Sequence, residues 1–347
     1  MRLLLERKDV NTGMTDEHGR TPLCVAAENG HDGVVRALVE KSNANLNTAD
    51  LWGDSPLSWA ARNGHEGVVR LLLERNDNTG IANEGGRTPL SLAAQKGHDG
   101  VVRALVEKSN ANLNTADLWG DSPLSWAALN GREGVMRILL EQNETNADII
   151  NPLSGRTPLS CAAVTGLEGA VRILLGRADV NPNIADNNGL TPLSLAAMYG
   201  HEGVVRIFLE RKDVNLHKPD TFGLTPLSVA AQSGHEGVVR MLLERKGVSP
   251  DWADIFGRTP LSLAAKWGHG GVVRILLERH DVDPNAADKH GRTPLVVAAW
   301  CRKEEVVRIL LERNDVNLGT TDNNGQTAAS WAAQNHHYRI AKLLQAP

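Results

Sequence analysis

The sequence GRTPLSLAA at residues 86–94 occurs in ten related copies along this chain of 347 residues. The Thr or Ser at its third position recurs at intervals of 33 to 35 residues. These residues are Thr21, Ser55, Thr88, Ser122, Thr157, Thr191, Thr225, Thr259, Thr293 and Thr327. So constant a period indicates an array of stacked structural repeats, in which each unit contacts only its neighbours.

Each part of one repeat predicts a local structure. Thr88 is placed to cap a helix with its hydroxyl, and Pro89 suits the first helical position because its missing N–H is not needed there. Gly97 ends this helix at a position that favours positive φ. A second helix is predicted over residues 98–108, and residues 117–120 predict a type I turn. One repeat is therefore a β-turn, a short helix, a sharp turn, a longer helix and a loop.

This arrangement resembles the ankyrin repeat, whose pattern runs D-x-x-G-x-T-P-L-H-x-A-A-x-x-G-H, followed by V-V-x-x-L-L and D-V-N. Residues 220–235 read DTFGLTPLSVAAQSGH, and residues 238–243 read VVRMLL. The resemblance covers essentially the whole chain and implies an all-α, right-handed-twisted ankyrin-repeat solenoid of helix-turn-helix units joined by β-turn fingers. One departure is consistent: no copy has the family's His after T-P-L, and most have Ser. The hydrogen bond that this His makes in the family must therefore be replaced or absent.

We expect a single ankyrin-repeat domain over residues 1–347. Residues 1–15 predict a partial N-terminal repeat, since Met1–Lys8 matches the second half of a second helix. Residues 16–321 hold nine complete repeats, and residues 322–347 predict a degraded C-terminal cap repeat. Because no polar capping repeat precedes Met1, the chain is expected to be cut from a longer array or to be a gene fragment.

Charge and cysteine usage bear on the classes of partner. The net charge is −4, with basic and acidic residues interspersed, so we expect neither a nucleic-acid partner nor a membrane partner. No apolar run is long enough to span a bilayer. Cys24, Cys161 and Cys301 lie in distant repeats, so no disulfide is expected, and a reducing compartment, the cytoplasm, is predicted. We expect a monomer.

Residues with catalytic or metal-binding chemistry recur too regularly to form one site. Seven histidines share the position after the helix-ending Gly, where a structural role is expected: His31, His65, His98, His201, His235, His269 and His337. A zinc site needs ligands that converge at short spacing. The serines after T-P-L lie in no G-x-S-x-G turn, and no phosphate-binding loop motif is present. We therefore expect no enzyme activity, no metal and no cofactor.

Two further patterns predict structural roles. The second helices carry Arg and Glu four residues apart, which predicts pairs along their solvated face. These pairs are Arg36/Glu40, Arg70/Glu74, Arg103/Glu107, Arg206/Glu210, Arg240/Glu244, Arg274/Glu278 and Arg308/Glu312. Trp59, Trp126 and Trp331 take the place of a first-helix Leu found in other repeats, which predicts that they lie in the core.

The positions that vary between repeats predict where a partner binds. They are the two residues at the turn tip, the residue before the Thr, and the two residues after Ala-Ala. In ankyrin proteins these positions line the concave groove. Aromatic residues and Arg dominate interface energetics, and here they concentrate between residues 198 and 300. The candidates are Tyr199, Phe222, Phe256, Arg258, Lys266, Trp267, His290, Arg292 and Trp300.

A second pair of exposed aromatics, Trp52 and Trp119, lies at earlier turn tips. We include both as candidates but expect them to contribute less, because Gly85 separates them and their neighbours Asp54 and Asp121 are acidic. The basic residues among the other candidates predict an apolar partner segment with acidic flanks. In the alternative, the large side chains at these positions only pack on each other.

The predicted function is that of a protein–protein interaction scaffold, which binds a protein or peptide in its concave groove. Arrays with copies this similar resemble those of fungal proteins, which implies the sensor part of a larger receptor-like protein with a nucleotide-binding domain. One alternative is an accessory domain of a multi-domain enzyme. Another is a passive spacer without a partner, although a spacer has no reason to expose Trp and Phe at its turn tips.

Overall fold

The structure is a computed structural model that describes residues 12–41, 44–75, 80–108 and 111–345. The helix expected over Met1–Lys8 lies outside these residues. Twenty helices and no strand are found in the described part of the chain. Each repeat contributes two of them: a first helix, which follows the cap Thr or Ser and is called the inner helix, and a second helix, which is called the outer helix. The all-α repeat architecture is therefore confirmed. The chain divides into two compact units, which are described separately below.

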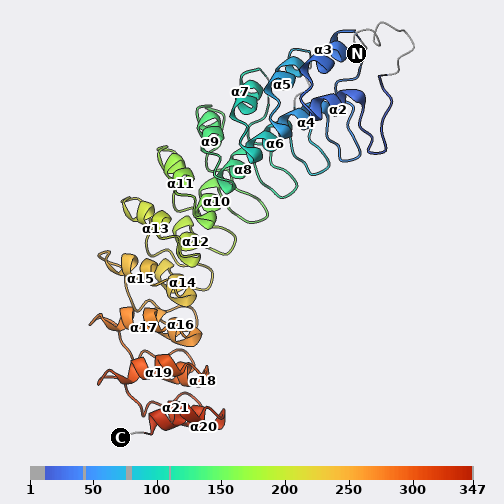
Figure 1. The fold of residues 1–347 in the computed structure, drawn as a ribbon. Coiled ribbons are helices and arrows are strands. Elements are labelled where there is room, and N and C mark those ends of the chain that lie inside the picture. Colours follow the sequence, from blue (N-terminus) through green and yellow to red (C-terminus); the bar gives the residue numbers. More distant parts are fainter. Residues whose placement is uncertain (1–11, 42–43, 76–79, 109–110, 346–347) are drawn as a thin grey trace. The chain divides into compact units, whose positions relative to one another are not determined.

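The N-terminal unit comprises Met1–Ala162 and Gly169–Asn181. Its inner helices α2, α4, α6 and α8 pack in one row, and its outer helices α3, α5, α7 and α9 pack in a second row (Figure 1). The helices are α2 (Pro22–Glu28), α3 (Asp32–Lys41), α4 (Pro56–Asn63), α5 (Glu66–Leu73), α6 (Pro89–Lys96), α7 (Asp99–Lys108), α8 (Pro123–Leu129), α9 (Glu133–Leu140), α10 (Pro158–Thr165) and α11 (Glu168–Leu175). Residues Ala163–Glu168, which comprise the end of α10, the turn and the first residue of α11, belong to the other unit.

The C-terminal unit comprises Ala163–Glu168 and Pro182–Pro347, and it repeats the same two rows (Figure 1). Its inner helices are α12 (Pro192–Met198), α14 (Pro226–Ser233), α16 (Pro260–Trp267), α18 (Pro294–Trp300) and α20 (Ala328–Gln334). Its outer helices are α13 (Glu202–Leu209), α15 (Glu236–Leu243), α17 (Gly270–Leu277), α19 (Glu304–Leu311) and α21 (Tyr338–Leu344).

The inner helices begin as the sequence predicts. The Thr88 hydroxyl accepts a hydrogen bond from the Ser91 amide at 3.2 Å, which confirms the N-cap. The two hydroxyl oxygens also lie 3.1 Å apart, within hydrogen-bond distance. Ser91 is buried, and the equivalent serines of most other repeats make the same contact. The Ser therefore stands in the place of the family's His and pairs with the cap Thr.

The turn between the two helices of a repeat is closed by the next repeat. Gly200 has φ 73°, as predicted, and the His235 ring lies against it. The ring nitrogen Nε2 of His235 lies 2.9 Å from the Met198 carbonyl oxygen. Where the array has Arg132 instead of His, its Nε donates to the Gln95 carbonyl at 3.1 Å. The recurrent histidines thus hydrogen-bond between repeats, which confirms their structural role.

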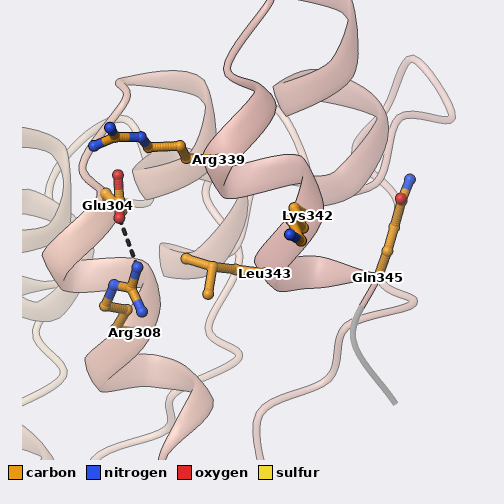
Figure 2. A pocket seen from close by; sticks show the side chains of 6 residues that line it. All are labelled: Glu304, Arg308, Arg339, Lys342, Leu343 and Gln345. Atoms are coloured by element: carbon orange, nitrogen blue, oxygen red, sulfur yellow. Dashed lines mark hydrogen bonds and ion pairs between the residues drawn. The ribbon is translucent and has the colours of Figure 1, made fainter.

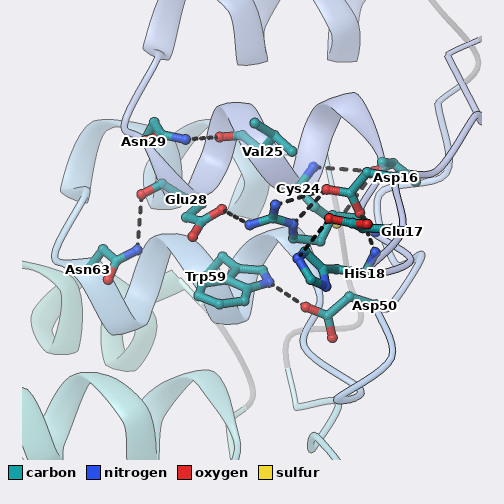
Figure 3. Close-up of polar contacts among 12 residues, drawn as sticks. Asp16, Glu17, His18, Cys24, Val25, Glu28, Asn29, Asp50, Trp59 and Asn63 are labelled. Carbon is teal, nitrogen blue, oxygen red and sulfur yellow. Dashed lines mark hydrogen bonds and ion pairs between the residues drawn. The ribbon is translucent and has the colours of Figure 1, made fainter.

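The three tryptophans expected in the core are only half-buried, so that prediction was wrong for Trp59, Trp126 and Trp331. The Trp59 indole N–H donates to Asp50 Oδ2 at 2.8 Å (Figure 3). Trp126 and Trp331 make the same bond to Asp117 and Asp322. A Leu cannot donate this bond. The larger indole instead reaches out of the core to the carboxylate that begins the turn.

The predicted Arg–Glu pairs on the outer helices were wrong in most of the cases that the structure describes. Arg36 does lie 3.8 Å from Glu40. However, Arg70 pairs with Glu66 at 2.9 Å, because Glu is more favourable at the N-terminal end of a helix, with Arg four residues later. Arg308 and Arg137 pair with Glu304 and Glu133 in the same way. Arg240 and Arg274 instead reach Glu278 and Glu312 of the next repeat.

At the other end of the outer helices, Asn side chains connect successive loops. Asn285 Oδ1 accepts the Asn317 amide at 2.7 Å, and its Nδ2 donates to the Asp315 carbonyl at 2.7 Å. Asp251 takes this position in the preceding repeat and keeps only the first of these bonds, from the Asp283 amide. Its Oδ1 is buried without a hydrogen-bond partner among the described residues. Burial raises the pKa of the Asp251 carboxyl above its ordinary value.

Replacing Gly200 with Val is expected to destabilise the fold by more than about 1 kcal/mol, since a β-branched residue tolerates positive φ poorly. A Cβ at this position would also lie 2.5 Å from the His235 ring. Denaturant unfolding of the full chain measures the loss. The matched control is Gly33→Ala, where no atom lies within 4 Å of the added Cβ and helix propensity favours Ala. Equal stability of the two variants would contradict this account of the turn.

Replacing Asp251 with Asn is expected to stabilise the fold at pH 7 by about 1 kcal/mol, because the amide supplies the missing donor and removes a buried charge. A carboxyl whose folded pKa is raised costs stability once the pH exceeds its unfolded pKa. The gain should therefore shrink as the pH falls toward the ordinary value of 3.8. Thermal melts between pH 3 and 7 measure it. Asn285→Asp should show the opposite sign, and a gain independent of pH would refute the explanation.

Candidate partner-binding surface

The residues expected to bind a partner between residues 198 and 300 all lie in the C-terminal unit. We call them the C-terminal aromatic surface: Tyr199, Phe222, Phe256, Arg258, Lys266, Trp267, His290, Arg292 and Trp300. Six of these residues carry an aromatic or imidazole ring. All of them except His290 are large hydrophobic side chains that remain exposed. The exposed fractions run from 39% for Trp300 to 52% for Phe222.

The turn tips of this surface are held in register by backbone hydrogen bonds. The amide of Ile255 donates to the Phe222 carbonyl at 3.0 Å, and the amide of Lys289 donates to the Phe256 carbonyl at 2.9 Å. Within each turn, the opening Asp accepts two amides; Asp254 Oδ1, for example, accepts those of Phe256 and Arg258. Phe222, Phe256 and His290 therefore occupy consecutive tips, as the sequence predicts.

The aromatic residues at the ends of the inner helices are only partly covered. Tyr199 stacks on His201, with ring centroids 6.2 Å apart. Trp300 lies 6.1 Å from the ring of Trp331 in the next repeat. The Lys266 ammonium lies 5.8 Å from the Trp267 ring centroid. Some of the aromatic area thus packs locally, but Trp267 and Tyr199 remain about half exposed.

The two candidate arginines are already engaged within the fold. Arg258 is bonded to Asp254, and Arg292 to Asp288, at the start of their own turns. Each guanidinium also lies over an aromatic ring, 4.8 Å from Phe256 and 5.0 Å from Trp300. These arginines orient the aromatic side chains while their charge is largely neutralised. Among the described residues beside these rings, Lys266 and Lys289 form no ion pair and supply the unpaired positive charge of the surface.

Trp52 and Trp119 lie at turn tips of the N-terminal unit and are 49% and 54% exposed. The structure brings them together more closely than the sequence suggested. Gly85, at the turn tip between them, opens a hollow of about 370 Å³ that both tryptophans line. We call it the Gly85 hollow; its other lining residues are Asp54, Trp59, Arg62, Asn83, Glu84 and Arg87. The sequence could have indicated this arrangement, because the identical segments 31–61 and 98–128 place the same Trp at the turn tips before and after Gly85.

The guanidinium groups at this hollow lie against indole rings. Arg62 is bonded to the buried Asp54 and lies 4.7 Å from the Trp59 ring. Arg87 lies between Trp119 and Trp126, at 4.7 and 4.3 Å from their ring centroids. Arg87 bonds to Asp117 of the next repeat, because its own turn begins with Asn83 rather than Asp. Burial raises the pKa of Asp54, an effect that Arg62 opposes.

A further hollow of about 720 Å³ lies beside the outer helices α19 and α21 of the C-terminal unit (Figure 2). Its lining includes Arg308, Arg339 and Lys342, with Arg308 bonded to Glu304. The only aliphatic side chain in its lining is Leu343. It is separate from the turn tips and contains none of the candidate residues.

Other chemistry in the described residues is limited. No group of three or more His, Cys, Asp or Glu side chains is placed to hold a metal ion there. All three cysteines are free, and burial raises the pKa of the Cys161 thiol to about 12. None of the helices that the structure describes combines the length and apolar character needed to cross a membrane.

Comparison with known families agrees with the repeat geometry. A sequence model described as ankyrin repeats (3 copies) matches nine overlapping segments that together span residues 1–346. The chain belongs to the ankyrin repeat family. The segments are 1–83, 41–117, 73–151, 104–185, 143–218, 171–252, 212–288, 246–322 and 282–346. A search of curated proteins found no match. Ankyrin repeats generally mediate protein–protein interactions, and proteins built from them are generally non-enzymatic scaffolds.

Proposed function

We propose that this ankyrin repeat protein binds a protein or peptide segment on its C-terminal aromatic surface. The observation that carries the proposal is the row of exposed aromatic residues on consecutive repeats. Phe222 and Phe256 lie at adjacent tips, and Trp267 follows at the end of an inner helix. Leaving such side chains exposed gains nothing for folding, whereas an interface that covers them gains substantial free energy.

The chemistry of the segment follows from the surroundings of these rings. Lys266 and Lys289 supply positive charge that no described carboxylate neutralises. Arg258 and Arg292, in contrast, are paired with buried carboxylates and act mainly by holding the Phe256 and Trp300 rings in place. An apolar or aromatic segment with flanking Asp or Glu residues therefore suits this surface best.

Other functions have less support. No group of three or more His, Cys, Asp or Glu side chains in the described residues is placed to hold a metal ion. A passive spacer needs the buried stacking but not the exposed aromatic tips. The free cysteines, each in a different repeat, suit a reducing compartment such as the cytoplasm. A role as the sensor part of a larger receptor rests only on resemblance to fungal arrays.

The proposal is tested by selecting peptides from a random display library on the full chain and then measuring their affinities. Enriched peptides should combine an aromatic or large aliphatic residue with neighbouring Asp or Glu. The double variant Phe256→Ala/Trp267→Ala should bind them at least about tenfold more weakly, because buried aromatic anchors commonly contribute about 2 kcal/mol or more each.

The matched control is Trp52→Ala, which removes an exposed aromatic from the same turn position in the N-terminal unit. It should leave the affinity of these peptides unchanged. The reverse ranking of the two variants would place the site in the N-terminal unit. Failure to enrich any peptide would favour the spacer.

A further inference from the structure

The Gly85 hollow differs from every other turn tip of the N-terminal unit. The equivalent tip residues are His18, Trp52, Trp119 and Leu153, so only Gly85 contributes no side chain. Trp119 leans toward the gap, with ring atoms 3.2 and 3.3 Å from the position that a Cβ of Gly85 would occupy. Trp52 lines the hollow as well, and its ring also meets the His18 ring, with centroids 5.5 Å apart. The missing side chain therefore leaves a space bounded by two half-exposed indoles.

The charge around this space is negative. The three turns that surround it, residues 50–54, 83–87 and 117–121, carry five carboxylates, of which Asp54 and Glu84 line the hollow, and one guanidinium, that of Arg87; Arg62 of α4 adds a second guanidinium to the lining. Both arginines are already paired, with Asp54 and Asp117. Glu84 lines the hollow, is exposed, and forms no ion pair with any residue in the described ranges. A cationic side chain that enters the hollow would therefore meet an unpaired carboxylate.

The hollow already shows how its indoles interact with guanidinium groups. Arg87 lies 4.7 Å from the Trp119 centroid and 4.3 Å from that of Trp126, and Arg62 lies 4.7 Å from Trp59. A planar guanidinium stacks on an indole face more effectively than an ammonium group does. Trp52 lines the hollow too, yet no described arginine covers it. Its ring is available to a guanidinium from outside the chain.

We infer that the Gly85 hollow receives one arginine side chain of a protein partner, with the guanidinium stacked on Trp52 and its charge directed to Glu84. The partner segment is basic at this point, in contrast to the acidic segment proposed for the C-terminal aromatic surface. The inference does not depend on that proposal, because the two sites share no residue and lie in different units.

The test uses the full chain and the peptide Ac-Ala-Ala-Arg-Ala-Ala-NH2, with two matched peptides in which citrulline or norleucine replaces Arg. Citrulline keeps the shape of Arg without its charge, and norleucine keeps only an apolar chain. Indole N–H signals of Trp52 and Trp119 are followed by NMR during titration to about 10 mM, a range suited to weak single-residue binding. The arginine peptide should shift these signals in a saturable way. It should bind at least about fivefold more tightly than either control peptide.

Two variants localise the binding. Gly85→Trp fills the hollow with the residue that both flanking repeats carry, at a glycine outside the set of positive-φ glycines. It should lower the affinity of the arginine peptide at least about tenfold, and a melting curve checks that the variant is folded once the Trp119 ring, 3.2 Å from the added Cβ, has moved aside. Glu84→Gln tests the charge alone and should weaken binding by a smaller factor. Phe256→Ala/Trp267→Ala should leave binding of this peptide unchanged, which separates the two sites.

Several outcomes would overturn the inference. Equal affinity of the citrulline peptide would show that charge is irrelevant, and tighter binding of the norleucine peptide would make the hollow an apolar site. Binding that survives Gly85→Trp in a folded protein would place the peptide elsewhere. Absence of saturable shifts in the wild-type chain would show that the hollow does not bind arginine.

Discussion

The contact between successive repeats is the interaction on which the rest of this structure depends. Ala93 and Ala94 of α6 are fully buried, as are the Ala pairs of neighbouring inner helices, because only small side chains let these helices pack closely. The same packing brings the His235 ring against Gly200 and its Nε2 within reach of the Met198 carbonyl. A repeat thus satisfies the backbone polar groups of the repeat before it, which an isolated repeat could not do.

The sequence predicted the parts of the structure that this contact imposes on every copy. The Thr88 cap and the positive φ of Gly200 follow from short local patterns, and the structural role of the histidines follows from their regular placement; all three are confirmed. Even Arg302 and His336, which replace that Gly, keep positive φ, with values of 58° and 60°. The packing of the two helices that the turn connects holds it in place, so the local preference of the residue is overridden.

Side-chain pairing was harder to predict because it depends on distances between repeats. The sequence placed Arg240 beside Glu244, but the guanidinium reaches Glu278 of the next repeat instead. Similarly, Trp59 was expected to fill a Leu position, whereas a carboxylate within reach of its indole N–H draws it outward. The Arg240 prediction treated a repeat as an isolated unit, whereas Asp50, the partner of Trp59, lies in the same repeat and was overlooked as a hydrogen-bond acceptor. The choice between a partner four residues away and one in the adjacent repeat is made by stacking geometry, which no single repeat contains.

The first residue of each turn determines whether the Arg before the cap Thr bonds within its own turn or to the turn of the next repeat. Where it is Asp, as at Asp254 and Asp288, the Arg before the cap Thr forms an ion pair with it in the same turn. The charges of that turn then neutralise each other. Asn83 cannot pair with Arg87, so this guanidinium crosses to Asp117 and lies between Trp119 and Trp126. Asn83 meanwhile donates to Asp54 of the preceding repeat. One Asp-to-Asn difference thus links three turns around Gly85, and the hollow arises where the array departs from its own pattern rather than where it follows it.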